Sequence, residues 1–182
     1  HRDISPDNIL VRADNEPVLI DFGAAREEAS KQSRLLSALR VVKDGYSPQE
    51  FYVAGSEQSP SCDLYSLAAS FYHIITGELP PDSPTRLAAA AAGDTDPFVS
   101  LSQRTNDYDE VFCKSLDKAM SVLPRERIQS AQEWLAMLNG DADVESTPEP
   151  QAKSRALSKA TSRVASPRKV AATGAEKSKM PV

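Results

Sequence analysis

The sequence predicts a mainly α-helical domain with one small β-hairpin near its start, followed by a disordered tail. Apolar residues recur at three- and four-residue spacings in several stretches between residues 59 and 139, as they do in helices that bury one face. Two short runs of branched apolar residues flank a turn-forming stretch near the start, which is typical of a hairpin. Large apolar residues are nearly absent beyond residue 140. We therefore expect a folded domain over residues 1–139, long enough to bury a core, and a tail over residues 140–182.

The hairpin is the first expected element. Its strands, residues 9–11 and 17–20, are rich in Ile, Leu and Val, and the Asp-Asn-Glu-Pro stretch at 14–17 favours a turn between them. Asn8 precedes the first strand and Asp21 follows the second. Pairing of the two strands would bring Asn8 and Asp21 together.

A long helix is expected next, and it should lie in the core. It begins at Ser59, a good helix cap, with Pro60 in the first turn, and it ends before Gly77. The apolar side chains that we expect to face the core are Leu64, Leu67, Ala68, Phe71, Ile74 and Ile75.

Three more helices complete the expected domain. Residues 87–92 fit a weaker surface helix, and the last helix opens with Ser130 and Glu133, which fit a capping box. The side chains that we expect to point inward are Tyr108, Val111, Phe112, Leu116, Ala119 and Met120 in one core helix and Trp134, Leu135 and Leu138 in the last.

Oxygen-bearing side chains near the start of the chain point to phosphoryl transfer. Asn8 comes five residues after Asp3, and Asp21 comes thirteen residues after Asn8. Carboxylate and amide oxygens bind hard cations such as Mg²⁺, and in-line transfer of a phosphoryl group depends on such ligands being held beside the acceptor hydroxyl. Asp3 and Asn8 belong to one motif, which begins His1-Arg2-Asp3, and Asp21 begins a second, Asp21-Phe22-Gly23. The two motifs in this order, on either side of a plausible hairpin, are improbable by chance.

These motifs resemble the C-terminal lobe of bacterial Ser/Thr protein kinases. The resemblance rests on HRDISPDN at residues 1–8, LIDFGAAR at 19–26 and GYSPQE at 45–50. It implies a kinase-like lobe in which Asp3 is the catalytic residue and Asn8 and Asp21 hold Mg²⁺ and bind ATP. The implied reaction moves the γ-phosphoryl group of ATP to Ser or Thr hydroxyls of proteins, with self-phosphorylation as one outcome. Since the chain begins inside the first motif, we expect the N-terminal lobe to be missing and these residues to be inactive by themselves.

The same resemblance gives roles to residues around the centre. It implies that His1 packs against Phe22, that Gly23 completes the metal-binding motif, and that Leu10 forms an apolar floor under the adenine. Arg2 would bind a phosphate or carboxylate on the activation segment that follows Gly23. The serines of that segment that we expect to be phosphorylated are Ser30, Ser33 and Ser37.

Two further pairs are implied away from the metal ligands. Glu50, in a Pro-Gln-Glu stretch where the family usually has Ala-Pro-Glu, would form a buried ion pair with Arg127. Asp63, at the start of the long helix, would brace the backbone of the catalytic loop. The chain departs from the family at Ser5, where a lysine is usual, and Lys43 falls near the place of a usual threonine. Either Lys43 delivers the missing charge, or it is simply solvated.

Three classes of function fit the motifs to different degrees. An active protein kinase is favoured because its catalytic and metal-binding residues are all present. A pseudokinase or scaffolding module would be favoured if the N-terminal lobe lacked its own nucleotide-binding residues. A small-molecule phosphotransferase is disfavoured, because such enzymes usually lack the Phe22-Gly23 pair and an activation segment that ends like residues 48–50.

Composition bears on partners and location. The tail beyond residue 140 holds eight Lys and Arg against five Asp and Glu, in a chain of net charge −5. A flexible linker is favoured over a basic patch, so no specific nucleic-acid binding is expected. Cys62 and Cys113 have apolar neighbours, which favours buried reduced thiols. We expect a cytoplasmic protein, with membrane anchoring through further sequence left open.

Overall fold

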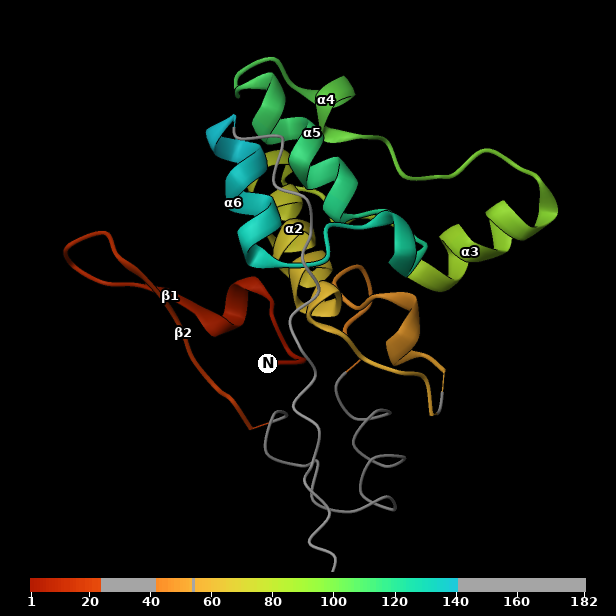
Figure 1. Cartoon of the computed structure of the whole chain (residues 1–182), viewed down its shortest axis with the longest axis horizontal. Coiled ribbons are helices and arrows are strands. Elements are labelled where there is room, and N and C mark those ends of the chain that lie inside the picture. The colour runs from red at the N-terminus through yellow and green to blue at the C-terminus, as the bar shows by residue number, and fades with distance from the viewer. Residues whose placement is uncertain (24–41, 54, 141–182) are drawn as a thin grey trace, which may run out of the picture. The chain divides into compact units, whose positions relative to one another are not determined.

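The computed structural model describes residues 1–23, 42–53 and 55–140. The chain divides into two units, residues 1–146 and 147–182, and every described residue lies in the first. The elements in chain order are η1 (Pro6–Asn8), β1 (Ile9–Val11), β2 (Pro17–Leu19), η3 (Gln49–Phe51), α2 (Pro60–Thr76), α3 (Ser83–Ala92), α4 (Leu101–Arg104), α5 (Glu110–Ala119), η4 (Pro124–Glu126) and α6 (Ala131–Asn139) (Figure 1). The described part is mostly helical with a two-stranded sheet, which confirms the predicted fold class at that level. The predicted tail lies outside the described residues, apart from Gly140.

The predicted hairpin is confirmed. Strands β1 and β2 pair antiparallel, with Ile9 opposite Leu19. One further backbone hydrogen bond, from the nitrogen of Ile20 to the carbonyl of Asn8 at 2.9 Å, extends the ladder toward the start of the hairpin. Since Asn8 lies opposite Ile20, the next residue, Asp21, follows directly after this pairing.

Helix α2 has the predicted ends but a different buried face. It starts after Ser59 and stops at Gly77, whose φ of 72° is left-handed, a conformation that glycine adopts at little cost. Its fully buried apolar side chains, with relative exposure of 0 to 1%, are Tyr65, Ala68, Ala69 and Tyr72. The prediction that Phe71 and Ile74 face the core was wrong, since they are 38% and 63% exposed.

Two buried serines explain why the buried face of α2 differs from the predicted face. Ser66 and Ser70 are buried, and their hydroxyls donate to the helix carbonyls of Cys62 and Ser66 at 3.1 and 2.8 Å. A serine that bonds to the preceding turn can face the core without an unpaired polar group. Apolar spacing alone does not reveal this possibility.

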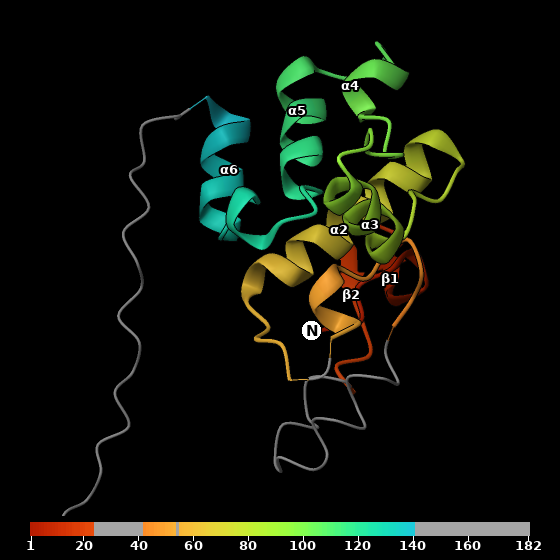
Figure 2. The same cartoon turned by 90° about the vertical axis from the view of Figure 1, so that its right-hand side faces the viewer.

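Helix α5 packs against α2, α4 and α6 (Figure 2). Leu116, Ala119 and Met120 are buried as predicted. Tyr108 and Val111 are 47% and 43% exposed, which corrects the prediction for both. The reason is the start of the helix: its cap is Asp109, so Tyr108 precedes the helix and Val111 lies in its first turn.

Helix α6 has the predicted cap at Ser130, whose hydroxyl accepts from the nitrogen of Glu133 at 3.0 Å, while the Glu133 side chain accepts from the nitrogen of Gln129, one residue before the cap, at 2.8 Å. Trp134 is buried and donates from Nε1 to the Ser115 hydroxyl at 2.8 Å. The prediction that Leu135 and Leu138 point inward was wrong, since they are 59% and 40% exposed. One helix face holds Trp134 and Met137, three residues later, against the core. Each leucine lies one residue further around the helix and therefore faces outward.

Helix α3 begins at Ser83, earlier than the predicted residue 87, because the Asp82 side chain accepts from the nitrogen of Thr85 at 2.9 Å. The short helix α4 was not predicted. Its first residues are held from α5, where Asp117 accepts from the nitrogens of Leu101 and Ser102. None of the helices in the described ranges has both the length and the apolar character that a membrane span requires.

Candidate active site

The site begins with a contact between Asp3 and Asn8. Asn8 is buried at the end of η1, and its Nδ2 donates to the Asp3 carbonyl at 2.7 Å and to Asp3 Oδ2 at 3.0 Å. These two hydrogen bonds fix the Asp3 carboxylate relative to the loop. Because the amide nitrogen of Asn8 is used in this way, its amide oxygen is the atom that remains for a cation.

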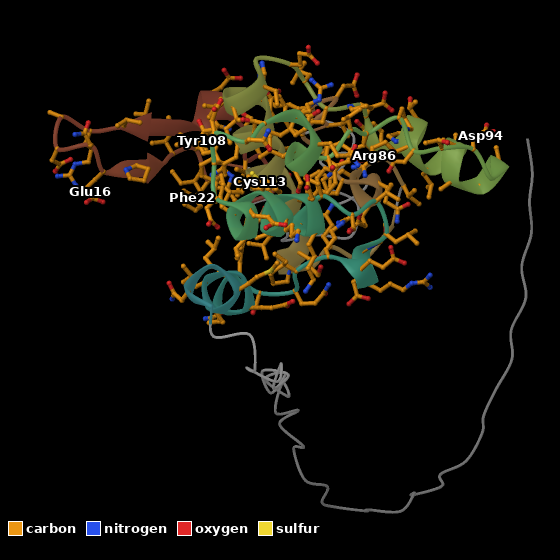
Figure 3. The ribbon with its side chains drawn as sticks, turned by 90° about the horizontal axis from the view of Figure 1, so that it is seen from above. Glu16, Phe22, Arg86, Asp94, Tyr108 and Cys113 are labelled. Atoms are coloured by element: carbon orange, nitrogen blue, oxygen red, sulfur yellow. The ribbon has the colours of Figure 1, made fainter. Side chains whose placement is uncertain are left out.

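Asp21 is placed by the hairpin and by its own backbone. Its φ of 60° is left-handed, and its Oδ1 accepts from the nitrogen of Gly23 at 3.1 Å. A Cβ at Gly23 would lie 2.9 Å from that oxygen, so a larger residue here would displace the Asp21 carboxylate from this position. Asp21, Phe22 and Gly23 are all exposed. Figure 3 shows Phe22 at the opposite end of the hairpin from Glu16 at its tip.

The donor set fits a hard cation. Asp21 supplies a carboxylate and Asn8 an amide oxygen, and Mg²⁺ typically takes one or two such protein ligands and completes its shell with water and phosphate oxygens. Across the described residues, no group of three or more His, Cys, Asp or Glu side chains could hold a metal by itself. The arrangement is therefore suited to a metal that arrives with phosphate, and it does not resemble a closed structural metal site.

Asp63, in the first turn of α2, holds the backbone of His1 and Arg2 in place. Its Oδ2 accepts from the backbone nitrogen of His1 and its Oδ1 from that of Arg2, both at 2.8 Å. Arg2 has a φ of 70°, which is costly for a residue with a side chain and persists only when the surroundings enforce it. Asp63 provides that enforcement, because both of its carboxylate oxygens are used on consecutive backbone nitrogens.

His1 joins the loop to the hairpin. Its Nε2 donates to the carbonyl of Ile20 at 2.9 Å, and its Nδ1 accepts from the nitrogen of Asp3 at 3.3 Å. The ring meets the ring of Phe22 edge-on, with centroids 4.6 Å apart. His1 thus links Asp3 to Ile20 and Phe22, the two residues on either side of Asp21. Leu10, the predicted adenine floor, is 53% exposed on β1.

Lys43 reaches the catalytic loop from a distant segment. Its Nζ donates to the Ser5 hydroxyl at 2.9 Å and lies 3.4 Å from Asp3 Oδ1 and 3.6 Å from Asp7 Oδ2. The contact with Asp7, four residues after Asp3 in sequence, was not predicted. The predicted phosphorylation sites between Gly23 and Lys43 lie outside the described residues.

Glu50 and Arg127 form a buried, two-pronged ion pair. Nη1 donates to Oε1 at 2.7 Å and Nη2 to Oε2 at 3.0 Å, and the two side chains are 5% and 0% exposed. Arg127 also donates to the carbonyls of Ser121 and Val122 at 2.7 and 2.8 Å. Its guanidinium carbon lies 4.9 Å from the ring centre of Tyr65. The charge is therefore paired, hydrogen-bonded and stacked, as a buried charge requires.

Cys62 adds a third contact to this pair. Its thiol donates to Glu50 Oε1 at 3.4 Å. Burial, followed by the nearby charge of Glu50, raises the pKa of Cys62 to about 11. The thiol therefore stays protonated near neutral pH and acts as a donor to the carboxylate.

A second buried arginine was not predicted from the sequence. Arg86 on α3 is 2% exposed, donates to both oxygens of Asp96 and to the Met120 carbonyl, and lies 4.4 Å from the ring centre of Phe98. Burial alone would raise the pKa of Asp96, but the hydrogen bonds from Arg86 and the Phe98 nitrogen, with the charge of Arg86, lower it. Figure 3 shows Arg86 on the inner part of α3, away from Asp94. A lone arginine in an Ala-rich helix was the available signal.

Comparison with known proteins identifies the family. Residues 1–137 match the family model of the protein kinase domain, so the chain belongs to the protein kinase family. It is 34% identical over 143 residues to the serine/threonine-protein kinase PknA of Nostoc. The aligned region covers 76% of this chain and 24% of that protein. It is 36% identical over 145 residues to the serine/threonine-protein kinase PknB of Mycobacterium leprae, covering 76% and 22%. The chain thus spans about a quarter of the length of these curated relatives.

Solved structures support the same conclusion. The structure described as "PpkA-294 apo form" is 33% identical, with a TM-score of 0.59 over 75% of this chain and 45% of that one. The PknI kinase domain of Mycobacterium tuberculosis, at 24% identity, shares the fold with a TM-score of 0.50 over 78% of this chain and 46% of its own.

Proposed function

We propose that residues 1–139 form the C-terminal lobe of a protein Ser/Thr kinase. The names of the curated relatives and the partial coverage of a solved kinase support this assignment. The N-terminal lobe, in this proposal, belongs to a longer protein that carries these residues. We further propose that this longer kinase is cytoplasmic, that it phosphorylates proteins on Ser or Thr, and that it can be its own substrate.

The proposed reaction transfers the γ-phosphoryl group of ATP. The acceptor hydroxyl oxygen forms a bond to the γ-phosphorus while the bond from that phosphorus to the β,γ-bridging oxygen breaks, giving ADP and a phosphoester. Asp3 orients the hydroxyl and takes its proton. Asn8 and Asp21 would hold Mg²⁺, which neutralises charge on the phosphates when bound. The chain's own contribution is orientation: Asn8 fixes Asp3, and Asp63 fixes the backbone that carries it.

The observation that carries the proposal is the joined geometry of the loop. The Asn8 side chain donates a hydrogen bond to the Asp3 carboxylate at 3.0 Å. Ile20 pairs with Asn8 across the hairpin, and Asp21 is the residue after Ile20. Phosphoryl transfer gains most of its rate from such positioning. Phosphoryl transfer requires metal ligands and a base held in fixed positions, and this arrangement supports that requirement.

A first test compares residues 1–182 with the longer kinase. We expect no transfer from labelled ATP to a generic protein substrate by residues 1–182, because in a protein kinase the N-terminal lobe normally covers the nucleotide and aligns its phosphates. The longer kinase should label Ser or Thr, in a manner abolished by chelation of Mg²⁺. Transfer by residues 1–182 would contradict the need for a second lobe. A longer protein with no transfer at all would favour a pseudokinase.

A further inference from the structure

We propose that Lys43 supplies the transfer site with the positive charge that the catalytic loop lacks at Ser5. This inference rests on the proposed kinase function. Lys43 lies 38 positions after Ser5 in sequence, and its side chain reaches the Ser5 hydroxyl. The proposal implies that the lysine could stand at either of these two positions and still serve the transfer site.

The first argument is the set of atoms that Lys43 contacts. An ammonium group has three donors, and the Nζ of Lys43 faces three oxygens at 2.9, 3.4 and 3.6 Å, on Ser5, Asp3 and Asp7. The side chain as a whole is 35% exposed, so Lys43 is not sealed inside the protein. Asp3 is the proposed base. A charge at this distance from it lies beside the acceptor hydroxyl and the group being transferred.

The second argument is that the backbone of Lys43 is fixed. Its nitrogen donates to the Ser47 hydroxyl at 2.9 Å, and its carbonyl accepts from the nitrogens of Tyr46 and Ser47 at 3.0 and 2.9 Å. Within this turn Gly45 has a φ of 83°, and a Cβ there would lie 3.1 Å from the Pro80 carbonyl. The turn is thus closed by hydrogen bonds and packed closely on a neighbouring segment, so the lysine starts from a defined position.

The third argument concerns size and burial at position 5. Ser5 is completely buried, and its hydroxyl accepts from the lysine. A serine side chain is too short to reach beyond its own loop, whereas the four-carbon stem of lysine spans the gap between the segments. One position provides the long cation and the other the small hydroxyl. The charge should therefore be transferable between them.

The fourth argument is electrostatic. Asp3 and Asp7 place two carboxylates on one loop, and the ammonium group of Lys43 lies within 4 Å of both. Without this charge, the phosphates of ATP and the developing charge of the transition state would face two carboxylates that Lys43 no longer neutralises. A fixed charge aimed at the transferring group acts mainly on the transition state and therefore on kcat.

The test uses the longer kinase with three variants. Lys43→Ala should lower kcat by more than about tenfold and leave the KM for ATP nearly unchanged. Lys43→Arg should retain part of the activity. The double exchange Ser5→Lys with Lys43→Ser should recover most of the rate that Lys43→Ala loses. The matched control is Lys114→Ala, which removes an exposed lysine that pairs with Glu110 on the same helix and should change nothing.

Two outcomes would overturn the proposal. One is an unchanged kcat in Lys43→Ala. The other is a loss of activity that comes with a lower thermal midpoint and is not restored by the double exchange, because that pattern belongs to a merely structural lysine. Asp3→Asn, measured in parallel, separates this inference from the function on which it rests. If Asp3→Asn is inactive while Lys43→Ala is fully active, the kinase assignment stands and the role of Lys43 falls.

Discussion

Replacing Asp3 with asparagine in the longer kinase should reduce kcat by roughly 10²- to 10⁴-fold, the contribution typical of a positioned general base. The substitution preserves size and removes the negative charge of the side chain, and with it the capacity to take the hydroxyl proton. The loop should keep its shape, because Asn8 also donates to the Asp3 backbone carbonyl at 2.7 Å, a bond that the substitution leaves intact. The thermal midpoint should therefore change little.

Steady-state phosphorylation of a protein substrate, together with a thermal melt, measures both effects. Asp14→Asn is the matched control: it removes the same charge at the exposed tip of the hairpin, where Asp14 pairs with Arg12. Its rate should equal that of the unmodified kinase. An Asp3→Asn variant as fast as this control would remove Asp3 from the chemistry.

Glu50→Gln should destabilise the protein by about 3–5 kcal/mol, because it leaves Arg127 buried without a compensating charge. The guanidinium is fully buried and cannot recover water as a partner without opening the fold. For a domain of this size, we expect a fall in Tm of roughly 10 °C. Chemical denaturation should show the same loss as a lower midpoint with an unchanged slope.

The neighbouring pair of Arg125 and Glu126 provides the control. It is 81% and 53% exposed, with 3.6 Å between the charged atoms, and exposed pairs contribute about 0–1 kcal/mol. Glu126→Gln should therefore leave the melt nearly unchanged. Equal stabilities for the Glu50→Gln and Glu126→Gln variants would show that the buried ion pair does not stabilise the fold.

Local signals predicted the elements well. The hairpin followed from two branched runs around a turn, and both ends of α2 followed from Ser59, Pro60 and Gly77. These signals act within a few residues, because caps and turns are satisfied by nearby backbone groups. Such features can be predicted without knowledge of the rest of the chain.

The buried faces of the helices were harder to predict. Ile74 and Leu135 fit an apolar stripe but are exposed, while Ser66 is buried. The direction that a helix faces depends on the partner against which it packs, and a serine bonded to the preceding turn can lie in the core. Spacing alone contains no information on either point.

The candidate site shows the same contrast between local features, which can be predicted from the sequence, and long-range contacts, which cannot. Asp3, Asn8 and Asp21 lie within a short stretch, so the motifs around them were enough to propose all three as site residues, and that assignment stays a prediction. The contact of Lys43 with Ser5 could be raised as a hypothesis only because both residues depart from the family pattern. Arg86 and Asp96 belong to no such motif, and only the folded chain shows that these two side chains meet.

The most direct measurement of the central claim is phosphate transfer from labelled ATP by the Asp21→Asn variant of the longer kinase, over a series of Mg²⁺ concentrations. The account predicts transfer reduced by orders of magnitude at every concentration, with a thermal midpoint equal to that of the unmodified protein, because Asp21 is exposed and supports the metal and not the core. Undiminished transfer by this variant would contradict the assignment of the hairpin and its flanking residues to phosphoryl transfer.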